Sequence, residues 1–77
     1  MYTIIGKVTC PWCDKAEELL LEKNGAVSVV TLEEEPWLRP VLKAGGFETV
    51  PIIIDPVGQV IRGYEALVEY FKELDNG

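Results

Sequence analysis

The chain has 77 residues and a mass of 8.6 kDa, which suits one domain, residues 1–77, near the lower size limit for folding alone. Thirteen acidic and seven basic residues give a net charge of −6, which repels a phosphate backbone and argues against nucleic-acid binding. No uncharged stretch reaches the roughly 20 apolar residues that cross a bilayer, and the N-terminus has no basic segment before an apolar one. We therefore expect a cytoplasmic protein with no membrane partner.

The first third of the chain predicts a strand, a helix and a second strand. Residues 2–8 are rich in β-branched side chains and predict the first strand. Residues 11–24 carry apolar side chains at helical spacing, with Pro11 suited to the first turn and Gly25 acting as part of a stop signal. Residues 26–32 predict the second strand.

A short helix is predicted next. Residues 33–36 combine three acids with a proline, as at the start of a helix, where acids favour the positive end of the dipole and Pro36 fits the first helical position. Residues 37–44 then form the helix, which Pro40 should kink or shorten.

The last third predicts a hairpin and a final helix. Residues 50–54 are apolar throughout and predict a strand buried on both faces, followed by a turn at residues 55–58 and a strand at residues 59–62. Residues 64–74 have the apolar spacing of an amphipathic helix, at Leu67, Val68, Tyr70, Phe71 and Leu74. The order β-α-β-α-β-β-α predicts an α/β fold with two parallel strands, an antiparallel hairpin and helices on both faces.

The two cysteines are the main chemical signal. Cys10 and Cys13 form a C-x-x-C motif where the first strand passes to the first helix, and the chain contains no histidine. Cys10 should lie at the helix N-terminus, where unpaired N–H groups stabilise a thiolate, and Lys7 adds positive potential. We expect Cys13, one turn further on, to be less exposed. This geometry predicts that Cys10 attacks a disulfide and that Cys13 resolves the mixed disulfide.

Two other interpretations of the motif are weaker. A zinc site needs four ligands, and the chain offers no further cysteine and no histidine, so carboxylates or a second chain would have to complete it. An inert buried pair is disfavoured by the flanking Pro11 and Trp12. The strand-to-helix context favours redox chemistry.

Four segments together resemble the glutaredoxin family across essentially the whole chain. They are the CPWC motif at residues 10–13, which is similar to the family's CPYC; the TVP of residues 49–51; the Arg62-Gly63-Tyr64-Glu65 segment; and the LVEYFK of residues 67–72. The short length and the turn at residues 55–58 resemble the small glutaredoxins of bacteriophages and bacteria.

The resemblance implies a thioredoxin fold, with a four-stranded mixed sheet flanked by three helices and a cis peptide bond before Pro51. It also implies that the N–H and C=O of Val50 stay free to pair with the cysteine of glutathione, as an added strand would. The glutathione-binding residues implied by position are Lys7, Trp12, Arg39, Thr49, Val50, Pro51, Gly63, Tyr64 and Glu65.

Several of these residues also fit ordinary roles. Lys7 and Arg39 suit solvated surface positions equally well, and Trp12 suits packing as well as contact with protein substrates. Arg62 stands where the family usually has glycine, so its side chain either points away or adds a cation that attracts the carboxylates of glutathione. Glu65 replaces the usual Asp and is one methylene longer.

The implied activity is that of a glutathione-disulfide oxidoreductase. The resemblance implies a monomer with no bound cofactor or metal, which uses glutathione as reducing co-substrate. Its substrates would be glutathione mixed disulfides and disulfide-containing proteins, with ribonucleotide reductase as the protein substrate by analogy.

Three alternatives stay open. The first is a glutaredoxin-like redoxin that serves ribonucleotide reductase and is reduced by thioredoxin reductase. The second is a two-chain iron–sulfur cluster carrier that uses Cys10 and two glutathiones, and the third is a purely structural adaptor. The rigid loop that Pro11 gives disfavours the cluster.

Overall fold

The computed structural model describes residues 1–76, and within them the elements follow the predicted order β-α-β-α-β-β-α. They are β1 (Tyr2–Gly6), α1 (Pro11–Asn24), β2 (Val27–Thr31), α2 (Leu38–Ala44), β3 (Ile52–Ile54), β4 (Val60–Arg62) and α3 (Tyr64–Asn76). Each strand is shorter than predicted because its outer residues belong to the connecting turns. None of the helices in this part of the chain is long and apolar enough to cross a bilayer.

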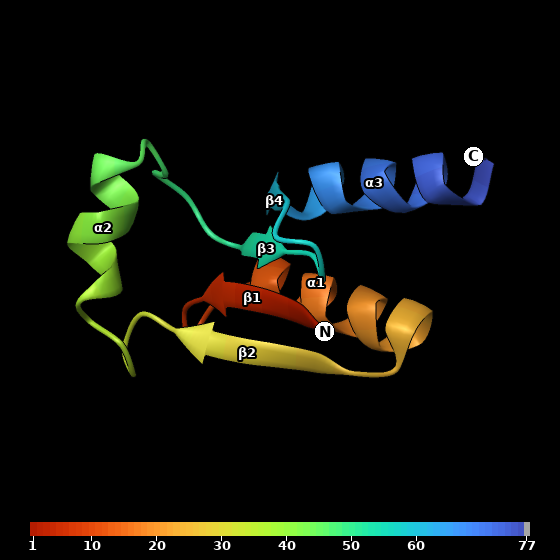
Figure 1. The fold of residues 1–77 in the computed structure, drawn as a ribbon. Coiled ribbons are helices and arrows are strands. Elements are labelled where there is room, and N and C mark those ends of the chain that lie inside the picture. The colour runs from red at the N-terminus through yellow and green to blue at the C-terminus, as the bar shows by residue number, and fades with distance from the viewer. Residues whose placement is uncertain (77) are drawn as a thin grey trace.

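The described strands form one mixed sheet in the order β2-β1-β3-β4. β1 and β2 run parallel, whereas β3 pairs antiparallel with both β1 and β4 (Figure 1). The register aligns Ile5 with Ile52 and Ile52 with Arg62. The end of β1, the start of β3 and the end of β4 therefore lie at the same edge of the sheet.

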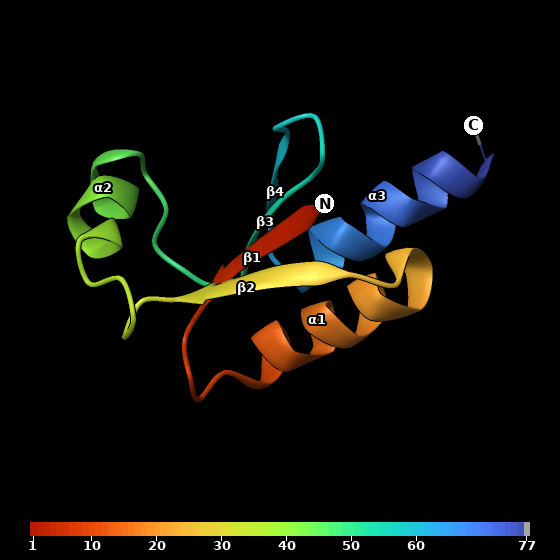
Figure 2. The ribbon, with the colours of Figure 1, turned by 60° about the horizontal axis from the view of Figure 1, so that its bottom comes forward.

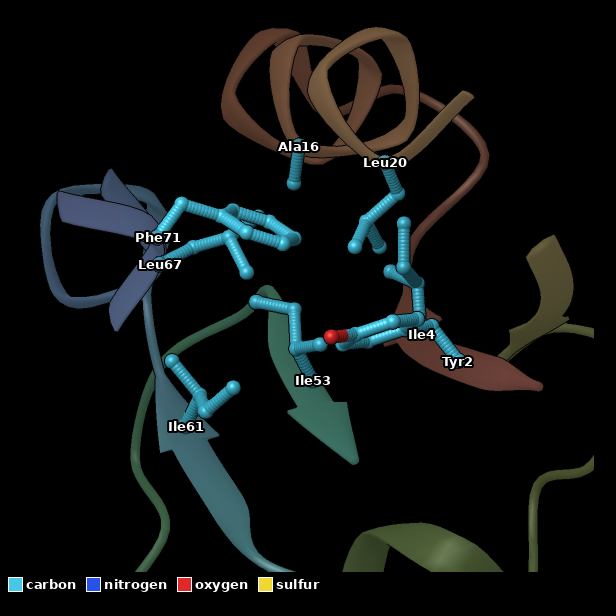
Figure 3. Packing of buried hydrophobic residues seen from close by; sticks show 8 residues of the cluster. All are labelled: Tyr2, Ile4, Ala16, Leu20, Ile53, Ile61, Leu67 and Phe71. Atoms are coloured by element: carbon cyan, nitrogen blue, oxygen red, sulfur yellow. The ribbon is translucent and has the colours of Figure 1, made fainter. Parts of the chain in front are cut away.

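The two faces of the sheet carry separate apolar clusters. Ile4 and Ile53 point to one face, where they pack with side chains of α1 and α3 (Figure 3). Their sequence neighbours Ile5 and Ile52 point to the other face and pack with Leu32 and half-buried side chains around α2. This alternation is the period of two that a strand imposes on its side chains, and it confirms the prediction of helices on both faces.

α1 begins and ends where the sequence predicts. Pro11 is its first residue and Cys10 is its N-cap, in extended conformation with φ −153°. Gly25 ends the helix in the left-handed region with φ +77°, which glycine adopts without a steric penalty, and its N–H donates to the Leu21 carbonyl. Ala16 and Leu20 are fully buried under the sheet.

α2 differs from the prediction at its start. It begins at Leu38, so Pro36 is not its first residue, and residues 32–37 form consecutive turns instead. Pro40 is the third helical residue and does not break the helix, because an N–H in the first turn has no helical partner to lose. No side chain of residues 38–44 is buried, and Figure 1 and Figure 2 show α2 standing apart from α1 and α3.

A buried carboxylate fixes the turn between β3 and β4. Asp55 is 4% exposed, and its Oδ1 accepts hydrogen bonds from the N–H groups of Val57 and Gln59 at 3.1 and 2.7 Å. The hydroxyl of Tyr70 donates to its Oδ2 at 3.1 Å and so ties the turn to α3. Leu74, predicted on the apolar face of α3, is instead exposed, because buried contacts of α3 end at Phe71.

Candidate active site

The cysteine pair lies at the N-terminus of α1, as the sequence predicts. Cys10 and Cys13 form a disulfide with their Cα atoms 5.2 Å apart. The backbone N–H of Cys13 donates to Cys10 Sγ at 3.2 Å, so the Cys10 sulfur accepts a bond from the first turn of the helix. An N–H group aimed at this sulfur, together with the positive end of the dipole, favours its thiolate when the disulfide opens.

The two cysteine residues differ little in exposure. Cys13 is 7% exposed and Cys10 is 9% exposed, so the difference has the predicted direction but both residues are buried in the disulfide form. The distinct roles of the two cysteines therefore stay a prediction that rests on position in the helix.

Gly6 packs directly against Cys13, a contact that the sequence reasoning missed. A Cβ placed on Gly6 would lie 2.8 Å from Cys13 Sγ and 3.2 Å from Cys13 Cβ. Gly6 is the last residue of β1 and does not have a positive φ, so only the space beside Cys13 requires glycine there. The one available signal was a glycine at the end of an otherwise β-branched strand.

The segment before β3 presents an unpaired backbone. The Val50–Pro51 peptide bond is cis, as the resemblance implied, and Pro51 is buried. Within the described part of the chain, neither the N–H nor the C=O of Val50 has a hydrogen-bond partner. An extended peptide laid beside Val50 could take both groups, as an added strand does.

Two pockets meet at Val50, and together we call them the groove. The larger pocket, of about 380 Å³, is lined by Lys7, Leu32, Arg39, Leu42, Lys43, Phe47, Glu48, Thr49, Val50 and Ile52. The smaller, of about 260 Å³, is lined by Trp12, Val50, Pro51, Arg62, Gly63, Tyr64 and Glu65. All nine residues predicted to bind glutathione line one pocket or the other. The sheet register gathers those that lie next to the ends of β1 and β4 and the start of β3, whereas Trp12 comes from α1 and Arg39 from α2.

The groove gathers positive charge in an acidic protein. Four of the seven basic residues line it: Lys7, Arg39, Lys43 and Arg62. Among residues 1–76, none of these four has a carboxylate within ion-pair distance, whereas Lys23 pairs with Asp75 and Lys72 with Glu69. Lys43 was not predicted as a site residue, although its i, i+4 spacing from Arg39 in the predicted helix of residues 37–44 was a signal that the two share a helix face.

Arg62 points to the groove rather than away from it. Its guanidinium carbon lies 4.1 Å from the centre of the Phe47 ring, which itself lines the larger pocket. Stacking on a ring leaves the guanidinium N–H groups at its edge free to bind a carboxylate. Of the two orientations left open by the sequence, the structure supports the one that adds a cation at the site.

An aromatic pair borders the smaller pocket. The rings of Trp12 and Tyr64 lie 5.8 Å apart, and the ammonium of Lys15 lies 4.6 Å from the Trp12 ring centre. Trp12 is 52% exposed and packs on Tyr64 and Lys15, so its position fits both roles considered from the sequence, surface packing and contact with a substrate. Its exposed face is available to a bound molecule.

Metal-ligating side chains do not gather at this site. Within residues 1–76, no group of three or more cysteine, aspartate or glutamate side chains could hold a metal ion.

Comparisons with known proteins agree with the resemblance. Residues 4–77 match the family model described as the N-terminal domain of glutathione S-transferase. A curated protein, glutaredoxin 1 of Rickettsia conorii, is 38% identical over 77 residues, which cover 95% of this chain and 71% of that protein.

Solved structures give the same fold. The dithiolic glutaredoxin 2-C-Grx1 of Trypanosoma brucei brucei has a TM-score of 0.76 at 32% identity and covers 94% of this chain and 77% of its own. The buckwheat glutaredoxin–glutathione complex has a TM-score of 0.77 at 18% identity over 94% of this chain and 68% of its own. The NrdH-redoxin of Escherichia coli has a TM-score of 0.69 at 21% identity, over 84% of each chain. The architecture is therefore the thioredoxin-like fold of these proteins.

Proposed function

Since this chain belongs to the glutaredoxin family and carries its dithiol motif, we propose that it reduces protein disulfides and glutathione mixed disulfides with glutathione as the reductant. The observation that carries the proposal is a dithiol at a helix N-terminus beside a groove with an unpaired backbone at Val50 and cations along both sides. Glutathione is a small anionic peptide, and these features suit a ligand of that chemistry.

The proposed reaction uses the two sulfurs in turn. The Cys10 thiolate attacks a substrate disulfide, forms a mixed disulfide and releases one substrate thiol. The Cys13 thiolate then attacks Cys10 Sγ and releases the second thiol, which leaves the Cys10–Cys13 disulfide seen in the structure. Two glutathione molecules reduce this disulfide and are joined as oxidised glutathione, so the electrons balance.

Each end of glutathione has a matching part of the groove. Lys7 and Arg39 line the larger pocket and suit the glycine carboxylate. Gly63 and Tyr64 line the smaller pocket at the start of α3, where free N–H groups suit the γ-glutamyl carboxylate, and Glu65 suits its ammonium group. The Val50 backbone would pair with the central cysteine. We propose Trp12, Thr49 and Pro51 as further walls of the same site.

Cysteine variants and a choice of reductants test this proposal. The assay follows reduction of a small glutathione mixed disulfide, recycled either by glutathione with glutathione reductase or by thioredoxin reductase. We expect turnover with glutathione, retained deglutathionylation in Cys13→Ser and loss of all activity in Cys10→Ser. Lys72→Gln, on α3 and outside the groove, serves as a charge control. Activity that survives in Cys10→Ser but not in Cys13→Ser would reverse the assignment of roles.

A second function, that of a redoxin reduced by thioredoxin reductase, has one observation in its favour. Arg62 occupies the groove where the family usually has glycine, and it changes the smaller pocket proposed for the γ-glutamyl group. Turnover with thioredoxin reductase alone would establish this second function and remove glutathione as the reductant.

We also propose a setting for the reaction. The chain would act as one monomeric domain over residues 1–77, in a reducing cytoplasm, with ribonucleotide reductase as a candidate protein substrate. Gel filtration of the reduced protein tests the monomer, and elution at twice the expected mass would contradict it.

A further inference from the structure

The positive charge of the groove exceeds what glutathione can neutralise. Glutathione has two carboxylates, and the arrangement proposed above assigns one to Lys7 and Arg39 and the other to the N–H groups at the start of α3. That arrangement holds both carboxylates without Lys43 or Arg62, and neither of these cations has a carboxylate partner within residues 1–76. These two cations are available for a larger substrate.

Both cations lie where a bound chain would pass. Lys43 lines the larger pocket, Arg62 lines the smaller, and Val50 lines both. A peptide extended along the Val50 backbone would therefore direct side chains toward a cation on either side of its central residue. The stack on Phe47 fixes the Arg62 guanidinium and lowers the entropy that a carboxylate contact would cost.

Negative charge lies mainly outside the groove. α1 carries four acidic and two basic residues and α3 carries four acidic and one basic, whereas α2 carries two basic residues and no acidic one. The acids that precede α2 keep their charge, with Glu33 accepting from the Val8 N–H and Glu34 from the Thr31 hydroxyl, but none of residues 33–35 lines either pocket. Only Glu48 and Glu65 oppose the four cations among the groove residues described.

We propose that the groove selects disulfides whose cysteine is flanked by acidic residues in a protein substrate, with Lys43 and Arg62 as the specificity-determining residues. This inference rests on the proposed dithiol function but not on glutathione as the reductant. At 0.1 M salt, charges more than about 10 Å apart are largely screened. The groove cations therefore act on the segment bound beside them, whereas the acidic residues elsewhere on the surface, which give the net charge of −6, are largely screened from it.

A single-turnover assay with three matched peptides tests the inference without any glutathione. Each peptide has one cysteine held as a mixed disulfide with 2-mercaptoethanol, and glutamate, glutamine or lysine on both sides of it. The reduced Cys10 attacks the peptide sulfur and releases 2-mercaptoethanol, and Cys13 then releases the peptide thiol. The peptide disulfide gains two electrons and two protons, which the cysteine pair supplies.

At 0.1 M salt we expect the glutamate peptide to react about tenfold faster than the lysine peptide, with the glutamine peptide between them. Lys43→Gln and Arg62→Gln should each reduce this preference about two- to threefold, whereas Lys72→Gln, which makes the same charge change outside the groove, should leave it intact. Added salt should weaken the preference in the unmodified protein.

The outcomes separate this inference from the proposed function. Equal rates for the three peptides, or an equal loss of preference in Lys72→Gln, would refute the inference and leave the dithiol function standing. A preserved preference in a protein that glutathione cannot recycle would refute the glutathione proposal and support the inference. Failure to reduce any peptide would refute both.

Discussion

The contact between Gly6 and Cys13 gives the sharpest prediction, because alanine at position 6 has no space for its methyl group. The added Cβ would lie 2.8 Å from Cys13 Sγ, well inside ordinary contact distance. Cys13 is buried and the Gly6 carbonyl accepts a hydrogen bond from the Leu32 N–H at 2.8 Å, so neither side can move without disturbing the first turn of α1 or the sheet. Overpacking of this kind costs about 1–3 kcal/mol, and we expect Gly6→Ala to lower the free energy of unfolding by that amount.

The same substitution should shift the redox balance of the cysteine pair. In the disulfide form the Cys13 sulfur is tethered beside Gly6, whereas in the dithiol form it can rotate away, so alanine destabilises the oxidised state more. If Gly6→Ala destabilises the disulfide form by about 1–3 kcal/mol more than the dithiol form, the reduction potential of the cysteine pair rises by about 20–60 mV, since 30 mV corresponds to 1.4 kcal/mol for two electrons. Equilibration with a glutathione or dithiothreitol buffer, followed by mass spectrometry after alkylation, measures this shift.

Two comparisons decide whether contact with the Cys13 sulfur causes the loss of stability in Gly6→Ala. In a Cys13→Ala background the sulfur is gone, so Gly6→Ala should cost at least about 1 kcal/mol less than in the unmodified protein. Gly45→Ala is a matched change without a positive φ, and there the nearest atom is on the Phe47 ring at 3.2 Å, a side chain that can shift. An unchanged potential, or the same cost of Gly6→Ala with and without the sulfur, would refute the reasoning.

Three further predictions concern the scaffold. Asp55→Ala should lower the free energy of unfolding by about 2–4 kcal/mol in chemical denaturation, because three donors lose their acceptor, and a loss below 1 kcal/mol would contradict this role. The hydrogen bond with Tyr2, then burial, then the bond to Asp55 raise the pKa of Tyr70 well above its ordinary value near 10. Folded Tyr70 thus holds its proton more tightly than unfolded Tyr70. The stability that this proton gives is complete below pH 10 and is lost above it, by up to about 1.4 kcal/mol per pH unit. Tyr70→Phe should therefore flatten the fall in the free energy of unfolding between pH 10 and 11.5, and an unchanged slope would contradict this role. Leu20→Ala should cost about 2–5 kcal/mol, as measured by denaturation, because its side chain is fully buried, whereas Leu21→Ala, at an exposed position of the same helix, should cost less than about 1 kcal/mol.

Elements whose bounds depend on local chemistry could be predicted from the sequence. Pro11 and Gly25 define the bounds of α1, because a proline suits the first helical turn and a glycine suits the left-handed residue after the last. The same local pattern misplaced the start of α2, since it put Pro36 at the first helical position and Pro40 in the interior. The helix instead begins at Leu38, which places Pro40 in its first turn, and Leu38 and Leu42 pack on the sheet.

The assembly of the candidate site depends on contacts between segments that are distant in the chain. The antiparallel pairing of β3 with β1 and β4 brings Val50, Lys7 and Arg62 to one edge of the sheet, although they are far apart in the chain. Strand pairing sets these distances, and no local propensity encodes it. For the same reason the stack of Arg62 on Phe47 and the packing of Gly6 against Cys13 could not be predicted from the residues in order along the chain.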